Sequence, residues 1–296
     1  MSPERRANLK ADPAFPAAVR QTAGMLLDVY EGNRILNLII SDRGRFFVSL
    51  FALDLHFRHG DAGTGGLTPG RLKEMCKAQG ICSATRADAV LTLMKIAGYI
   101  ERAPGARDRR LRELVPTEKL IANLRKRWRC HLAPAAALLP DATQALGMLG
   151  QPEFVRGVVR LISAYYCAGF RFIDHAPALR RFADHNGGLM LLFACLTADN
   201  EDDLGPQYAA SVSISQLARS INASRAHVGK LLKEAESEGL VRRPDGGGIV
   251  LMPYLVDSLH EFFALNYLIL THFAKTTRDH LGAAPRIEPL APAVFP

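Results

Sequence analysis

The chain carries the same pattern of residues twice, and the two copies lie 141 residues apart. In each copy a serine is followed fifteen residues later by a glycine, with Ser83 and Gly98 in the first copy and Ser224 and Gly239 in the second. The apolar positions between them coincide, and they are Ala87, Val90, Leu91 and Met94 in the first copy and Val228, Leu231, Leu232 and Ala235 in the second. Solenoid repeats are only about 20–50 residues long. The spacing therefore predicts a duplicated domain.

Length and composition agree with two folded domains. The 296 residues, 48% apolar and 22% charged, suit about two domains of about 100–200 residues each. Shifts in composition predict a tail over 1–13, a first domain over 14–131, a linker over 132–152, a second domain over 153–282 and a disordered tail over 283–296. Residues 132–152 are predicted to form a linker or a short broken helix because the segment is rich in Ala, Pro and Gly.

Several classes of protein are disfavoured by what the sequence lacks. No stretch approaches the roughly 20 uninterrupted apolar residues of a membrane span, and the first thirteen residues lack the apolar core of a signal peptide. We therefore expect a cytoplasmic protein with no membrane partner. The five cysteines are too scattered for a disulfide framework or a CxxC zinc site, although a redox role for Cys76 and Cys82 is left open.

Each copy is predicted to be two helices joined by a tight turn, preceded by another helix and followed by two short strands. The paired helices are expected at 69–79 and 84–97 in the first copy and at 215–221 and 225–238 in the second. Residues 214–224 have helix-turn-helix spacing, in which the second helix of the pair enters the DNA major groove. Long apolar stripes around 155–166 and 256–270 predict helices that pack together. The fold class is therefore mainly α with small β wings, as two tandem winged helix-turn-helix domains whose long helices form a pseudo-dimer interface.

Charge favours a polyanionic partner. The formal net charge is +8, and residues 99–131 hold ten Lys or Arg against four Asp or Glu. A basic excess of this kind suits nucleic acid. The basic run 125–129 with its Trp128 is compatible either with phosphate contact or with a solvated helix face.

Residues 93–117 resemble the end of the recognition helix and the wing of the MarR family of bacterial regulators. The matching residues are Gly98, Ile100, Arg102, Asp108, Arg110 and Thr117. The resemblance implies that Arg110 enters the minor groove, that Asp108 orients it, and that the long terminal helices dimerise beside an effector cleft. The second wing, 242–248, is shorter and lacks the Asp-x-Arg pair, so the resemblance implies no deep minor-groove contact for it.

The predicted DNA-binding residues lie on the second helix of each pair and on the wings. They are Thr85, Arg86, Lys95, Arg107, Asp108 and Arg110 in the first copy and Arg225, His227, Lys230, Lys233 and Arg243 in the second. No catalytic constellation or cofactor motif is found, so we do not expect an enzyme or a cofactor. A cluster of Asp54, His56, His59 and Asp61 has too few matched ligands to predict a metal site.

We predict a sequence-specific, DNA-binding transcription regulator that acts as a ligand-responsive repressor. Its partners would be double-stranded DNA and a small-molecule effector, and one chain would serve as a pseudo-dimer, with a homodimer left open. Two alternatives remain: a plasmid-type replication initiator with two winged-helix domains, and a winged-helix scaffold that binds proteins.

Overall fold

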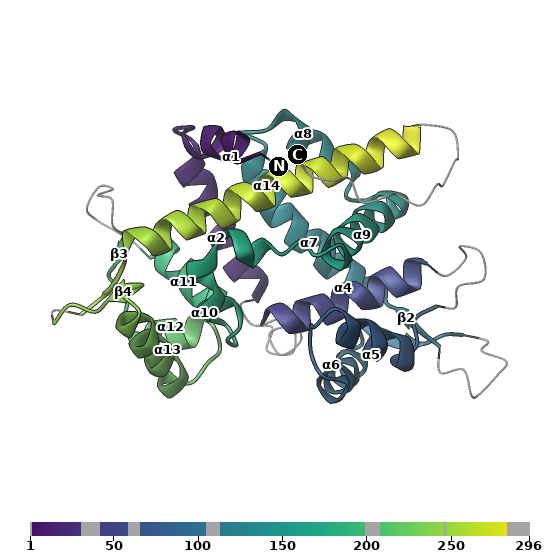
Figure 1. Ribbon diagram of the computed structural model, residues 1–296, viewed down its shortest axis with the longest axis horizontal. Helices are drawn as coiled ribbons and strands as arrows, with labels where there is room; N and C mark the ends of the chain where they lie inside the picture. The colour runs from purple at the N-terminus through teal and green to yellow at the C-terminus, as the bar shows by residue number, and fades with distance from the viewer. Residues whose placement is uncertain are drawn as a thin grey trace.

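The computed structural model describes residues 2–30, 42–58, 66–104, 113–198, 208–245 and 247–282, and these residues are mainly helical (Figure 1). The helices are α1 (Pro3–Lys10), α2 (Phe15–Tyr30), α4 (Arg43–Phe57), α5 (Pro69–Ala78), α6 (Ala84–Ile96), α7 (Glu118–Ala135), α8 (Pro140–Met148), α9 (Pro152–Cys167), α10 (Arg180–Ala183), α11 (Gly188–Thr197), α12 (Ile214–Ser220), α13 (Arg225–Ser237) and α14 (Pro253–Gly282), with 3-10 turns η1 (Phe172–His175) and η2 (Pro177–Leu179). The strands are β1 (Ile100–Arg102), β2 (Leu114–Pro116), β3 (Tyr208–Ala210), β4 (Val241–Arg242) and β5 (Ile249–Leu251).

Two groups of elements follow the same order. The first lobe consists of α4, α5, α6, β1 and β2, and the second lobe of α11, β3, α12, α13, β4 and β5. In the second lobe the antiparallel strands have the order β3-β5-β4. In the first lobe β1 pairs with β2, and Leu67 bridges Leu114 of β2 in the place that β3 takes beside β5. The two lobes therefore share their strand order as well as their helix order.

Local sequence explains where the third helix of each lobe begins and ends. The hydroxyl of Ser83 accepts from the backbone N–H of Arg86 at 3.2 Å, and that of Ser224 accepts from His227 N–H at 3.1 Å. Each contact satisfies one of the free N–H groups at a helix start, so both serines are helix caps. After each helix the chain turns at a glycine, Gly98 or Gly239, with a φ of 69° that favours glycine.

Two long helices, α2 and α9, each contact a helix in the lobe of the other half of the chain. α2 packs on α7 and also contacts α11 of the second lobe, while α9 packs on α14 and also contacts α4 of the first lobe. The apolar residues predicted to share a face on α9 and α14 are buried, as Val158 and Phe263 illustrate. α7 and α14 contact each other as well. Each half thus supplies a helix that completes the packing of the other.

Two predicted boundaries differ from the structure. The predicted tail 1–13 contains α1, which α14 holds because Arg6 and Lys10 both pair with Glu261. The segment 132–152, predicted as a linker or a short broken helix, contains the end of α7 and all of the short helix α8, and α8 contacts α7 and α14. Both segments are therefore part of the packed helices. The predicted tail 283–296 lies outside the described residues.

Among the residues that the structure describes, no helix is both long enough and apolar enough to cross a membrane.

Candidate nucleic-acid interface and central cavity

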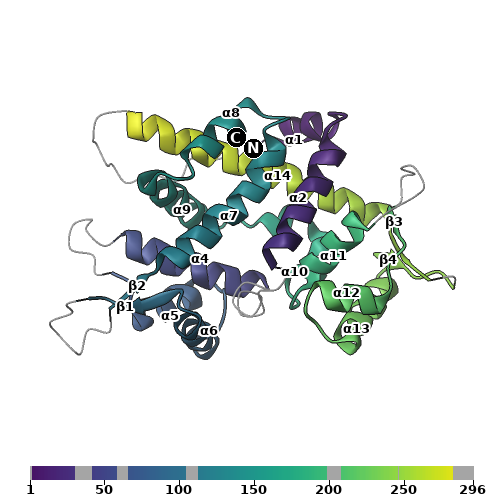
Figure 2. The same ribbon diagram turned by 180° about the vertical axis from the view of Figure 1, so that it is seen from behind.

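The third helices of the two lobes, α6 and α13, lie along the same edge of the molecule. Both stand at the lower edge in Figure 1 and again in the reverse view of Figure 2, while α14 runs across the opposite side. Each helix buries one face against its own lobe: Ala87, Val90, Leu91 and Met94 from α6, and Val228, Leu231, Leu232 and Ala235 from α13. The opposite faces remain exposed, so any extended partner along this edge would meet both helices.

On α6 the predicted contact residues Thr85, Arg86 and Lys95 are exposed. The Arg86 side chain is 50% exposed but is not free, because its guanidinium donates to Asp42 Oδ2 at 2.8 Å. Arg107, Asp108 and Arg110, the predicted wing residues, lie outside the described residues.

The predicted contact residues of the second copy, on α13 and just after β4, fall into two groups. Arg225, Lys230 and Lys233 are exposed. His227 is turned back toward its lobe, with its ring Nε2 2.9 Å from the backbone carbonyl of Asn186. Arg243 is held by Glu236, to which its backbone N–H and its Nε both donate at 2.8 Å.

The acidic residues of α13 lie toward its C-terminal end and are also paired. Arg181 of α10 donates to Glu234 at 3.0 Å and also pairs with Glu238. Pairing with Arg181 lowers the pKa of Glu238, and pairing with Arg243 lowers that of Glu236. Arg225, Lys230 and Lys233 of α13 remain exposed, and of these Lys230 lies 3.9 Å from Glu234.

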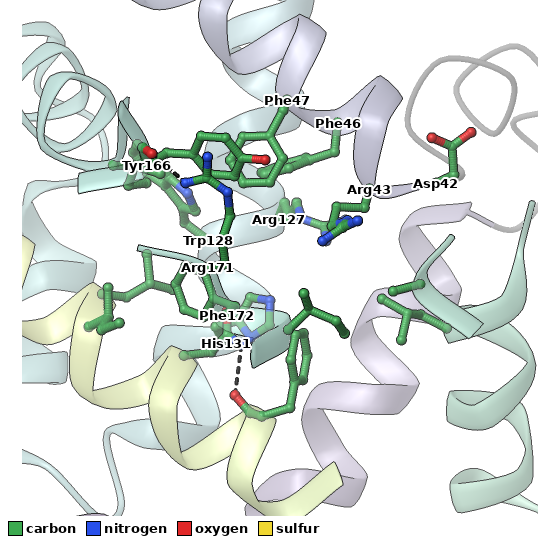
Figure 3. A pocket seen from close by; sticks show the side chains of 18 of the residues that line it. Asp42, Arg43, Phe46, Phe47, Arg127, Trp128, His131, Tyr166, Arg171 and Phe172 are labelled. Atoms are coloured by element: carbon green, nitrogen blue, oxygen red, sulfur yellow. Dashed lines mark hydrogen bonds between the residues drawn. The ribbon is translucent and has the colours of Figure 1, made fainter. Parts of the chain in front are cut away.

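A cavity of about 140 Å³ lies between the two lobes (Figure 3). Its wall is built from both halves of the chain: α2, α4 and α7 from the first, and α9, α11 and α14 from the second, together with η1 and its neighbours. The rings in this wall are those of Tyr30, Phe46, Phe47, Trp128, His131, Tyr166, Phe172 and Phe262. The charged side chains are those of Asp42, Arg43, Arg127 and Arg171.

Two of the arginines that line the cavity, Arg127 and Arg171, contact aromatic rings and neutral oxygen atoms. Arg127 donates to the hydroxyl of Tyr30 and lies 4.8 Å from the centre of the Phe46 ring. Arg171 lies 3.5 Å from the centre of the Tyr166 ring and donates to the backbone carbonyls of Tyr166 and Phe170. In the part of the chain that the structure describes, no carboxylate forms an ion pair with Arg127 or Arg171.

The beginning of α4 connects this cavity to both lobes. Asp42 caps α4 by accepting from the backbone N–H of Arg45 at 3.0 Å, and its other oxygen pairs with Arg86 of α6. The next residue, Arg43, reaches across to the second lobe and pairs with Asp184 at 2.9 Å.

The family resemblance implied an effector cleft beside the long terminal helices, but sequence reasoning named no residue of this cavity as part of such a cleft. The sequence feature nearest to the cavity was the basic run 125–129. In the structure Trp128 is buried and Arg127 lines the cavity, whereas Arg125 pairs with Glu118 on the helix surface. His131, six residues beyond Arg125, had no distinguishing pattern around it.

Other candidate clusters carry no site. Within the described residues no group of three or more potential ligands could hold a metal ion, and His59 and Asp61 lie outside them. Asp54 is fully buried and accepts from Ser163 at 2.7 Å and from Arg58 at 2.8 Å. Burial raises the pKa of the Cys76 thiol to about 12, which works against thiolate chemistry there.

No protein-family model, curated protein or solved structure matches this chain.

Proposed function

We propose that this protein is a sequence-specific, DNA-binding transcription regulator, built from two MarR-like winged helix-turn-helix domains in one chain. In this proposal each lobe is one domain, and α6 and α13 are the recognition helices that enter successive major grooves. The hairpins β1–β2 and β4–β5 are the wings. The protein acts as a ligand-responsive repressor.

The observation that carries the proposal is the common edge formed by α6 and α13, each beginning at a serine cap and presenting basic side chains. Recognition helices read base edges mainly with residues near their N-terminal ends. Arg86 and Arg225 both occupy the first turn of their helices.

The exchange of α2 and α9 between the lobes supports the single-chain arrangement. In a two-fold dimer, residue i of one subunit contacts residue j of the other, and j contacts i in return. The contacts α2–α11 and α9–α4 have this reciprocal form within one polypeptide. One chain would thus replace two subunits.

The two reading surfaces are not alike, and this predicts an asymmetric DNA site. Arg86 is paired with Asp42, whereas Arg225 is exposed and accompanied by Lys230 and Lys233. Different side chains prefer different bases. We therefore expect two unlike half-sites in a fixed orientation.

The test is selection from a random pool of double-stranded DNA, followed by anisotropy titrations on the winning sequence. Arg225→Ala should weaken binding by about 5- to 150-fold, the equivalent of about 1–3 kcal/mol for a base-reading arginine. Lys275→Ala, which changes an exposed residue of α14 across the molecule, is the matched control and should leave the affinity unchanged. Reversing one half-site should also abolish tight binding.

If the pool yields no enriched sequence and any DNA binding does not depend on salt, the protein is not a DNA regulator. That result would favour the protein-binding scaffold. An enriched perfect palindrome would reject the asymmetric reading while retaining DNA recognition.

A further inference from the structure

The third helices of the two lobes can be compared residue by residue. α6 and α13 have the same length, and each position of α6 has its equivalent 141 residues later in α13. Both helices lie along one edge of the molecule (Figure 1, Figure 2). A partner along this edge meets the outward faces of both helices, so the differences between those faces show what each lobe is suited to bind.

The outward face of α13 is basic. Arg225, Lys230 and Lys233 are exposed on it. Lys230 lies 3.9 Å from Glu234, but 79% of its side chain is exposed, so this ion pair is weak. Cations of this kind attract the phosphates of DNA whatever the base sequence.

The outward face of α6 has a different character. The positions equivalent to the three cations of α13 are occupied by Ala84, Ala89 and Thr92, all exposed. Between them stands Asp88, which is also exposed and is the equivalent of Gly229 in α13. The first lobe therefore presents a carboxylate in the region where the second lobe presents cations.

The carboxylate of Asp88 is available to a partner. Its side chain is 58% exposed, and Oδ1 lies 3.7 Å from Nζ of Lys73 on α5. An exposed ion pair of this length contributes little. The hydroxyl of Thr92 donates to the backbone carbonyl of Asp88 at 2.9 Å, so this neighbour does not occupy the carboxylate.

A carboxylate in the major groove distinguishes the four bases by hydrogen bonding. It only accepts hydrogen bonds, and cytosine offers an amino donor at N4. Guanine offers the acceptors N7 and O6, and adenine places the acceptor N7 beside its amino group. Thymine offers the acceptor O4 and a methyl group. Cytosine is therefore the base that suits a carboxylate best.

We propose that the two lobes divide the recognition of DNA, and this proposal rests on the proposed function. Lys230 and Lys233 of α13 attract the phosphates of any sequence. Asp88 of α6 accepts from N4 of a cytosine in the half-site of the first lobe. At any other base the carboxylate faces acceptors without a matching donor and lowers the affinity. Asp88 is thus a residue that determines specificity.

The first test is a base scan of the DNA selected from the random pool. Every base pair in the half-site of the first lobe is replaced in turn, and the affinity is measured by anisotropy. In the natural chain, replacement of the preferred cytosine should weaken binding about 5- to 150-fold. Asp88→Ala should lose this discrimination. Asp88→Asn should prefer adenine at the same position, because an amide pairs with N6 and N7 of adenine. Lower helix stability alone does not exchange one preferred base for another.

Two variants are the controls for the base scan. Asp279→Asn removes a carboxylate with a similar exposure, 56%, from α14 across the molecule. It should leave the affinity and the base preferences unchanged. Lys73→Gln removes the ion pair of Asp88 and leaves the carboxylate in place, so the preference for cytosine should remain. Loss of that preference in Lys73→Gln, or its survival in Asp88→Ala, would overturn the role of Asp88.

The second test transfers the carboxylate to α13. A Cβ atom added at Gly229 meets nothing within 4 Å, so Gly229→Asp and its control Gly229→Ala are both accommodated. The affinity for random-sequence DNA is measured over a range of salt concentrations. In Gly229→Asp the slope of log affinity against log salt should be smaller by about one than in Gly229→Ala, because the new carboxylate neutralises one cation of this face. Equal slopes would overturn the role of α13.

The outcomes separate this inference from the proposed function. If the natural chain enriches no sequence from the pool, the proposed function and this inference are both wrong. If it enriches a sequence but no cytosine preference depends on Asp88, only this inference is wrong.

Discussion

Gly157 provides the sharpest test of the packing between the two long helices of the second half, α9 and α14. A Cβ atom added at Gly157 would lie 2.4 Å from Cγ2 and 3.0 Å from Oγ1 of Thr277. Thr277 is 5% exposed and β-branched, so its side chain has little freedom to move aside. Overpacking of this kind costs about 1–3 kcal/mol. Replacing a helical glycine with alanine gains about 1 kcal/mol in the opposite direction.

Gly157→Ala should therefore lower the free energy of unfolding by up to about 2 kcal/mol, measured by urea denaturation followed by circular dichroism. In a Thr277→Ala background the two nearest atoms are absent. The same change at Gly157 should then be neutral or stabilising, and the coupling energy should be about 1–3 kcal/mol. Gly147→Ala in α8, where an added Cβ meets nothing within 4 Å, is the control and should stabilise by about 0.5–1 kcal/mol. If Gly157→Ala stabilises the natural chain as Gly147→Ala does, the close approach of α9 and α14 is wrong.

Two further predictions concern the buried histidine and the turns after the third helices. Because His131 has a pKa of about 3 in the folded chain against an ordinary 6.5, the unfolded chain takes up a proton below pH 6.5 while the folded chain does not. The free energy of unfolding therefore decreases as the pH falls. His131→Asn should reduce this decrease between pH 7 and pH 5 by about 2 kcal/mol in parallel urea titrations. An identical decrease in both chains would contradict a buried neutral ring. Gly98→Ala and Gly239→Ala should each cost about 1–2 kcal/mol, because each residue has a φ of 69°. If only one of the two substitutions lowers the free energy of unfolding, the two turns are not equivalent.

Local features of the fold could be predicted because they depend on residues only a few positions apart. The expected helices at 69–79 and 84–97 are found as Pro69–Ala78 and Ala84–Ile96. Those expected at 215–221 and 225–238 are found as Ile214–Ser220 and Arg225–Ser237. Serine caps, glycine turns and an apolar stripe every three to four residues carry this information.

The exposure of the predicted contact residues was only partly predictable. Periodicity places Arg86, His227 and Lys230 on the outer faces of their helices, and Lys230 is indeed exposed. Arg86 is exposed too, but its guanidinium contacts Asp42, and His227 contacts the backbone carbonyl of Asn186; each partner is 41 or more residues away in the sequence. No local pattern reports such partners.

The error at the N-terminus has the same origin. Residues 3–10 form a helix of eight residues, and so short a helix is marginal by itself in water. Its stability in the folded chain comes from the contacts of Arg6 and Lys10 with Glu261, about 250 residues away.

The sequence by itself determined that this chain forms capped helices and short strands and carries a net positive charge, because each of those properties is encoded within a few turns of chain. Only the tertiary structure decided that α2 and α9 cross to the opposite lobe, and that Arg43, His131 and Tyr166 line one cavity. These three residues are separated by long stretches of sequence and come from three helices. Their proximity results from how whole helix faces fit together, and no spacing along the chain records that fit.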